Sequence, residues 1–199
     1  MSDKSSTKTE RLAAYKSTAE FALVHPLDEF YARAGQPLPP LNEVDGHAVP
    51  EPYKTLLVHQ NDMTPMLEKF YRQNIHLRLI GRRLDGNEYF REVVLLLDAN
   101  NQPVEFGAIK MNLNLFPPAA RRQILEERRP LGHILEECRI PHASRPRAFI
   151  RVASDPLINE ALKLSGAHVL FGRRNTLFDP QGNPLAEIVE ILPPAPRPA

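Results

Sequence analysis

The regular part of the hydrophobic pattern begins at Asp62, after which apolar residues recur every three to four positions. This spacing is typical of a helix with one apolar face, and it is carried by Met63, Met66, Leu67, Phe70 and Tyr71. Asp62 or Thr64 is available as the N-cap, and Pro65 suits the first turn of a helix. The pattern therefore predicts a helix that starts at about Asp62.

From Ile75 onward the apolar period shortens to two, which is typical of β-strands. Apolar and polar residues alternate in IHLRLIGRRL, and two longer apolar runs flank the turn sequence DANNQP. RAFIRVAS indicates a further strand, and two more strands flank the turn sequence DPQGNP. The pattern predicts strands paired in hairpins, with the apolar runs VVLLL and LAEIVEIL in central positions.

Helices are predicted between these strands. The segment PPAARRQILEERRPLGHILEECR is helical with a break near Pro130, and DPLINEALKLSG is a short helix capped by Asp155 and ended by Gly166. Hairpins with helices between them indicate a single α+β domain built on a mainly antiparallel sheet.

Proline sets the two ends of the chain apart from its middle. Of the 199 residues 20 are proline, and many lie between Leu27 and Tyr53 or after Leu192. Because proline disfavours helix and sheet interiors, we expect residues 1–55 to be a partly irregular N-terminal extension, with a helix within residues 1–24. The domain itself is expected over 56–193, followed by a disordered tail over 194–199.

Composition argues against several classes of function. The formal net charge of +1 leaves no electrostatic footprint for nucleic acid or an anionic membrane, and no apolar run approaches the roughly 20 residues of a spanning helix. The N-terminus, MSDKSSTKTER, lacks the apolar core of a signal peptide. Cys138 is the single cysteine, so no internal disulfide forms. We expect a cytoplasmic protein that binds neither nucleic acid nor membranes.

Widespread catalytic motifs are missing from the sequence. It contains no Walker loop, G-x-G-x-x-G, G-x-S-x-G or H-E-x-x-H, and its seven histidines lack the spacing of metal ligands. We interpret His59, His76 and His168 as surface or strand residues and Cys138 as a small buried apolar residue. The residues thus predict neither a metal site nor a cofactor.

Four blocks of sequence lie in order between Leu56 and Pro193. They are LLVHQNDMTPMLEKFY, YFREVVLLLDANNQPVEFGAI, RRPLGHIL and FGRRNTLFDPQGNPLAEIVEILP. Together they resemble the chorismate pyruvate-lyase family. The resemblance implies a single α+β domain in which an antiparallel sheet and helices enclose a ligand cavity closed by flaps. It also implies a cofactor-independent activity that eliminates pyruvate from chorismate to give 4-hydroxybenzoate, in ubiquinone biosynthesis.

Carried over residue by residue, the resemblance assigns roles to five positions. Arg91 matches the arginine that binds the ring carboxylate, and Glu190 matches the glutamate that faces the ring hydroxyl and exchanges a proton. Met63, Leu131 and Gly132 match residues that line the ligand cavity, with Met63 on a closing segment. A guanidinium suits the role of Arg91 because it donates two charge-assisted hydrogen bonds to one carboxylate.

The residues themselves leave two alternatives open at this site. Arg91 either binds a ligand or pairs with Glu190 within the protein, because a buried arginine is costly unless it is paired. Glu187 and Glu190 lie three positions apart, so on a regular strand they face opposite sides, and the acid–base role stays open between them.

One position departs from the family pattern. Some members carry a second arginine where this chain has Ala108. Lys110 and Arg174 are the candidates to replace it.

Two other functions fit the same pocket. The first is a non-catalytic sensor of aromatic acids, since effector domains of some transcription regulators share the fold. Residues 1–55 contain no helix-turn-helix pattern, which disfavours this alternative. The second is a related enzyme of secondary metabolism that acts on another chorismate-derived acid. In each case the expected partner is a small molecule, with chorismate as substrate and 4-hydroxybenzoate as product in the leading hypothesis.

Overall fold

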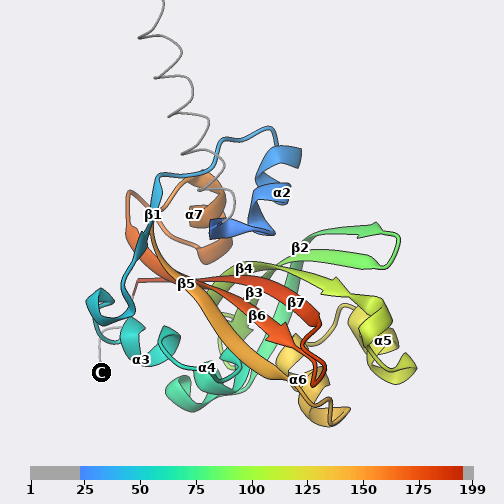
Figure 1. The fold of residues 1–199 in the computed structure, drawn as a ribbon. Helices are drawn as coiled ribbons and strands as arrows, with labels where there is room; N and C mark the ends of the chain where they lie inside the picture. Colours follow the sequence, from blue (N-terminus) through green and yellow to red (C-terminus); the bar gives the residue numbers. More distant parts are fainter. Residues whose placement is uncertain (1–22, 195–199) are drawn as a thin grey trace, which may run out of the picture.

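One antiparallel sheet of seven strands forms the centre of the computed structural model, which describes residues 23–194 (Figure 1). The strands are β1 (Leu41–Val44), β2 (Ile75–Asp85), β3 (Glu88–Leu97), β4 (Pro103–Asn112), β5 (Ala143–Ala153), β6 (Val169–Phe178) and β7 (Pro184–Leu192). Their order across the sheet is β1-β5-β6-β7-β4-β3-β2. This confirms the predicted α+β class and both predicted hairpins. The helix expected within residues 1–24 lies almost entirely outside the described residues, as does the tail after residue 194.

The helices are α2 (Leu27–Arg33), α3 (Tyr53–Leu57), α4 (Met63–Tyr71), α5 (Pro118–Leu125), α6 (Leu131–Glu137) and α7 (Pro156–Leu162). From Asp62 onward the helices begin close to the predicted positions, whereas α2 and α3 were not predicted. Asp155 caps α7 by accepting a hydrogen bond from the Ile158 amide at 2.9 Å. Helix α7 ends at Leu162 and not at Gly166, because Lys163 adopts a left-handed conformation with φ of 54°.

The prediction that both long apolar runs are central is right for β7 and wrong for β3. Strand β3 lies next to the edge strand β2. It is apolar because helices cover both of its faces: Val94 packs with α2 and α7, whereas Val93 and Leu95 pack with α3 and α4. Helices therefore bury the second-outermost strand as completely as a central one.

Residues 25–53 are more ordered than the proline pattern predicts. They contain α2, β1 and a 3₁₀ turn at Gly46–Ala48. Strand β1 extends the sheet by pairing with β5, and Leu27 and Tyr31 are part of the core. The elements are three to seven residues long and fit between the prolines, two of which, Pro26 and Pro52, directly precede helices. The boundary expected near residue 55 is therefore not a boundary of the sheet.

The two faces of the sheet carry different helices. Helices α2 and α7 lie on one face, whereas α3, α4 and α6 lie on the other (Figure 1). No helix among the described residues is long and apolar enough to span a membrane. The buried charged residues of the sheet lie on the second face, under α4 and α6: Arg91, Glu105, Arg173 and Glu190.

Candidate ligand site

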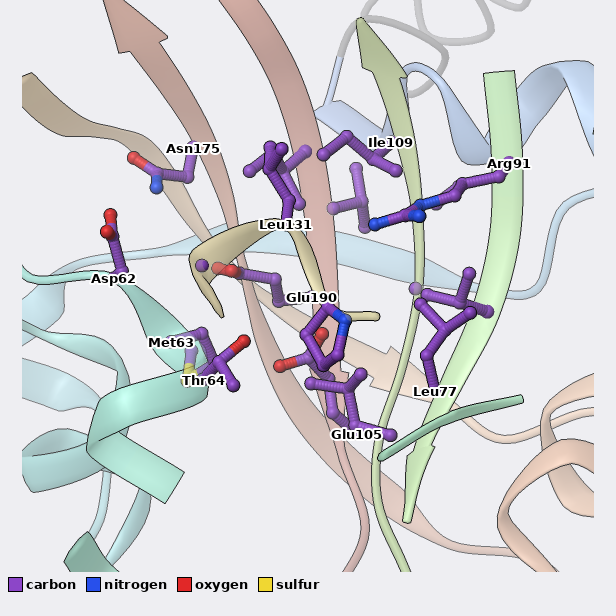
Figure 2. Close-up of a pocket in the computed structure, with 18 of the residues that line it drawn as sticks. Asp62, Met63, Thr64, Leu77, Arg91, Glu105, Ile109, Leu131, Asn175 and Glu190 are labelled. Atoms are coloured by element: carbon purple, nitrogen blue, oxygen red, sulfur yellow. The ribbon is translucent and has the colours of Figure 1, made fainter. Parts of the chain in front are cut away.

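A cavity lies between the sheet and the first turns of α4 and α6 (Figure 2). Its volume is about 60 Å³, several times the roughly 10–15 Å³ that one buried water needs. All five residues that the sequence singled out line it: Met63, Arg91, Leu131, Gly132 and Glu190. The structure thus brings together residues from four separate elements, β3, α4, α6 and β7, around one space.

The pairing register explains how the sheet forms the floor of the cavity. Val93 on β3 pairs with Gly107 on β4, and Gly107 pairs with Glu190 on β7. A Cβ atom at Gly107 would lie 2.1 Å from the Val189 carbonyl oxygen, so only glycine fits there. Neighbouring strands are about 4.8 Å apart, which separates β3 from β7 by about 10 Å. No side chain of residue 107 fills the space between them.

Arg91 enters this cavity from β3 and is left without a partner. Its side chain is 1% exposed, and its Nε and Nη1 atoms make no hydrogen bond within the described part of the chain. Burial lowers the pKa of Arg91 to about 10, an effect that Tyr89 and Glu127 partly oppose. Figure 2 shows the guanidinium extending from its strand into the pocket. The alternative in which Arg91 pairs with Glu190 is therefore wrong.

Glu190 is paired with a different arginine. Its carboxylate accepts a hydrogen bond from the Nε of Arg173, which is fully buried on the neighbouring strand β6. The remaining nitrogens of Arg173 donate to the carbonyl oxygens of His59, at 3.2 Å, and Asn61, at 3.1 Å. The Arg173–Glu190 ion pair thus fastens the segment before α4 to the sheet and fixes the position of the Glu190 carboxylate.

The alternation predicted for β7 is confirmed. Glu187 lies on the other face, partly exposed, and bonds to Arg174 at 3.1 Å. Lys110 bonds to Glu88 at 2.6 Å. Neither Lys110 nor Arg174 lines the cavity. Neither therefore replaces the second arginine that some family members carry at the position of Ala108. Both point away because they lie an odd number of positions from residues that line the floor.

Four polar residues that line the cavity were not assigned to it from the sequence: Asp62, Thr64, Glu105 and Asn175. The last two belong to the sheet. Glu105 on β4 is 5% exposed, and Asn175 on β6 is 1% exposed. Burial raises the pKa of Glu105 well above its usual range; the nearby Glu190 raises it further, while Arg173 lowers it. The signal was present, because Glu105 alternates with Gly107 and Ile109 on an otherwise apolar strand. This alternation points to a cavity residue only when the face of β4 that carries Glu105 is known to line a cavity.

Helices α4 and α6 close the cavity opposite the sheet. A Cβ atom at Gly132 would lie 3.2 Å from the Thr64 Cβ, so the two helices touch at their first turns. His133 on α6 also bonds to Glu68 on α4 at 3.0 Å. Asp62, just before α4, bonds to His142 at 2.9 Å. These contacts hold the covering helices in place over the ligand space.

The Asp62–His142 contact predicts a pH dependence of stability. The hydrogen bond that the Asp62 carboxylate accepts from His142 is the largest cause of the raised pKa of His142. The protonated imidazole is therefore favoured in the folded state, so the contribution is complete below about pH 6.5 and is lost as pH rises through the folded-state pKa. We expect Asp62→Asn to reduce the free energy of unfolding more at pH 6 than at pH 8.

Urea unfolding at the two pH values measures this difference. Asp98→Asn is the matched control, because it removes a histidine contact of similar length at an exposed site, the 2.7 Å bond to His76. Equal losses at both pH values for Asp62→Asn would contradict the assignment.

Comparison with known proteins supports the fold class of the chain. No family model and no curated protein matches the chain. Its fold is the chorismate-lyase-like α+β fold, with one seven-stranded antiparallel sheet and helices. The solved structures that it resembles include PhnF from Mycobacterium smegmatis, with 12% identity and a TM-score of 0.51 over 68% of this chain and 65% of that one.

Two shorter structures match over most of their own length. The effector domain of PhnF from M. smegmatis has 12% identity and a TM-score of 0.50, covering 66% of this chain and 87% of the domain. The SA0254 gene product of Staphylococcus aureus has 8% identity and a TM-score of 0.52, covering 69% and 90%. At such low identity the similarity establishes the fold alone.

Proposed function

We propose that the cavity binds one small carboxylic acid and that Arg91 holds its carboxylate. The observation that carries this proposal is the buried, unpartnered guanidinium of Arg91. Burying an unpaired charge costs several kcal/mol. Arg91 is nevertheless charged and buried, and it lines a cavity that a ligand could fill. A ligand carboxylate would offset it with two parallel hydrogen bonds to Nε and a terminal nitrogen.

The rest of the lining indicates the character of the acid. Leu77, Val93, Leu131 and Leu177 are apolar, whereas Glu105 and Glu190 supply polar groups. The small volume suits a compact, flat body such as one aromatic ring. A hydroxylated aromatic acid such as 4-hydroxybenzoate fits this combination.

The fold supports a binding role for this site. One structure that the chain resembles is the effector domain of PhnF, and a binding role requires no group beyond those that line the cavity. We propose the cytoplasm as the location, in keeping with the free cysteine Cys138.

A thermal-shift series tests the proposal. A ligand at 100 times its Kd adds about 2.7 kcal/mol to stability, which for a chain of this size is a rise of roughly 5–10 °C in Tm. We expect this rise with millimolar 4-hydroxybenzoate, a smaller one with benzoate and none with neutral benzamide. No shift with either acid would refute the small-acid site.

A second candidate function is the elimination of pyruvate from chorismate. It is favoured by one observation, the presence of Glu190 in the same cavity as Arg91 and on a strand about 10 Å away. The reaction needs a group that orients the ring carboxylate and an acid–base group near the breaking bond, and Arg91 and Glu190 are the residues proposed for these two roles.

Incubation with chorismate distinguishes catalysis from binding alone. Catalysis predicts the release of 4-hydroxybenzoate and pyruvate, with Glu190→Gln far slower than Glu187→Gln, because Glu187 lies on the other face. Binding without turnover would leave the effector-type role, and turnover of a different chorismate-derived acid would indicate the related enzyme.

A further inference from the structure

Glu105 is a further carboxyl group of the cavity, in addition to those of Asp62 and Glu190. Its Oε2 atom is buried and makes no hydrogen bond within the described residues. Leu95 pairs with Glu105 across the sheet, and Leu77 lies beyond Leu95 on β2. Buried polar atoms are normally hydrogen-bonded, so an unpartnered carboxyl oxygen in an apolar part of a cavity needs a physical explanation.

Among the described residues, neither arginine of the site makes a hydrogen bond or ion pair with Glu105. Arg173 donates its hydrogen bonds to Glu190 and to the segment 57–61. Arg91 pairs with Ile109, which is four residues from Glu105 along β4, or about 13 Å at 3.3 Å per residue. Figure 2 shows the carboxyl groups of Glu105 and Glu190 in the same part of the pocket, away from Arg91.

These surroundings favour the neutral form of Glu105. Burial and the neighbouring Glu190 both raise its pKa, since an apolar environment and a like charge each disfavour a second carboxylate. A neutral carboxylic acid carries one O–H donor. With Glu105 in this form, the cavity has a guanidinium at one end and an uncharged hydrogen-bond donor at the other.

We infer that Glu105 contacts the bound acid and donates a hydrogen bond to an uncharged oxygen at the end of the ligand opposite its carboxylate. This inference rests on the proposed acid site at Arg91 and narrows its ligand class. The cavity selects acids that carry a hydrogen-bond acceptor, such as a carbonyl, hydroxyl or ether oxygen, at their far end. An apolar group of the same size leaves the donor of Glu105 unpaired.

Calorimetric titration with two benzoates of similar size tests whether the cavity prefers an acceptor to an apolar group at the far end of the ligand. 4-Formylbenzoate presents an acceptor and no donor, whereas 4-methylbenzoate presents neither. We expect the wild-type protein to bind the formyl compound roughly 5- to 10-fold more tightly, the effect of one hydrogen bond. Glu105→Leu should bring this ratio close to one, and Glu105→Gln should keep it, because an amide nitrogen still donates.

Glu92→Gln is the matched control. Glu92 is another glutamate of the sheet; it is half-buried, and burial raises its pKa to about 7. It does not line the cavity, because it lies on the opposite face of β3 from Arg91 and Val93. Its replacement should leave the ratio of the two affinities unchanged.

The outcomes separate this inference from the proposed function. Tighter binding of the methyl compound, or a formyl preference that survives in Glu105→Leu, would overturn the role of Glu105 and leave the acid site standing. Failure of the wild-type protein to bind either acid would overturn both. An infrared difference spectrum of wild type minus Glu105→Gln at neutral pH checks the neutral form without any ligand. It should contain the C=O band of a protonated carboxylic acid, and carboxylate bands in its place would overturn the inference.

Discussion

Arg91→Met is expected to make the protein more stable while removing its affinity for small carboxylic acids. Methionine has a similar length and is apolar, so it occupies the same space next to Ile109 without a buried charge. Replacing buried ionic groups by apolar residues of similar volume often stabilises a protein by about 1–4 kcal/mol. We expect a gain in this range, because Arg91 makes no hydrogen bond through Nε or Nη1.

The expected loss of binding is large. A charge-assisted pair in a desolvated cavity costs about 2–5 kcal/mol when one partner is truncated, which weakens binding by at least 30-fold. Urea unfolding and calorimetric titration with 4-hydroxybenzoate measure the two effects. Arg122→Met, at an exposed position of α5, should change neither. A less stable Arg91→Met protein would mean that the guanidinium supports the fold and would count against its role as a ligand-binding group.

Arg173→Met is expected to have the opposite effect on stability. Arg173 is as completely buried as Arg91, but it is paired with Glu190 and bonded to the backbone before α4. Removing one partner of a buried ion pair typically costs about 3–5 kcal/mol, because the other charge stays buried and unpaired. The double variant Arg173→Met/Glu190→Gln should recover part of this loss.

Urea unfolding of the single and double variants checks this expectation. A single variant as stable as the wild type would show that the Arg173–Glu190 pair does not hold the fold together. The contrast between two buried arginines on one face of a sheet separates a structural role from a binding role.

Local patterns were enough to predict most of the elements. The helix at Asp62, the break near Pro130 and both hairpins follow from periods of 3.6 and 2 and from turn residues. The faces of β7 followed as well, because Glu187 and Glu190 differ by an odd number. The N-terminal third was harder to predict, since short elements between prolines carry too few residues to establish a period. β1 is four residues long and takes its place in the sheet only through its pairing with β5.

The charge pairing of the site could not be predicted from the sequence. Arg91, Arg173, Glu105 and Glu190 come from four strands, and several pairings are compatible with alternation along each strand. Which arginine faces which carboxylate depends on the register between strands, which is a long-range property. The register places Arg173 opposite Glu190 and Arg91 opposite Ile109, and this leaves one guanidinium and one carboxyl group for a ligand.

A crystal structure of the protein in complex with 4-hydroxybenzoate tests the central claim most directly. We predict that the ligand lies over Gly107 with its carboxylate at 2.7–3.2 Å from Arg91 nitrogens, the range of ordinary N–H···O hydrogen bonds. The hydroxyl should point toward Glu105 and Glu190. A ligand bound outside this cavity, or bound inside it with the carboxylate turned away from Arg91, would contradict the account.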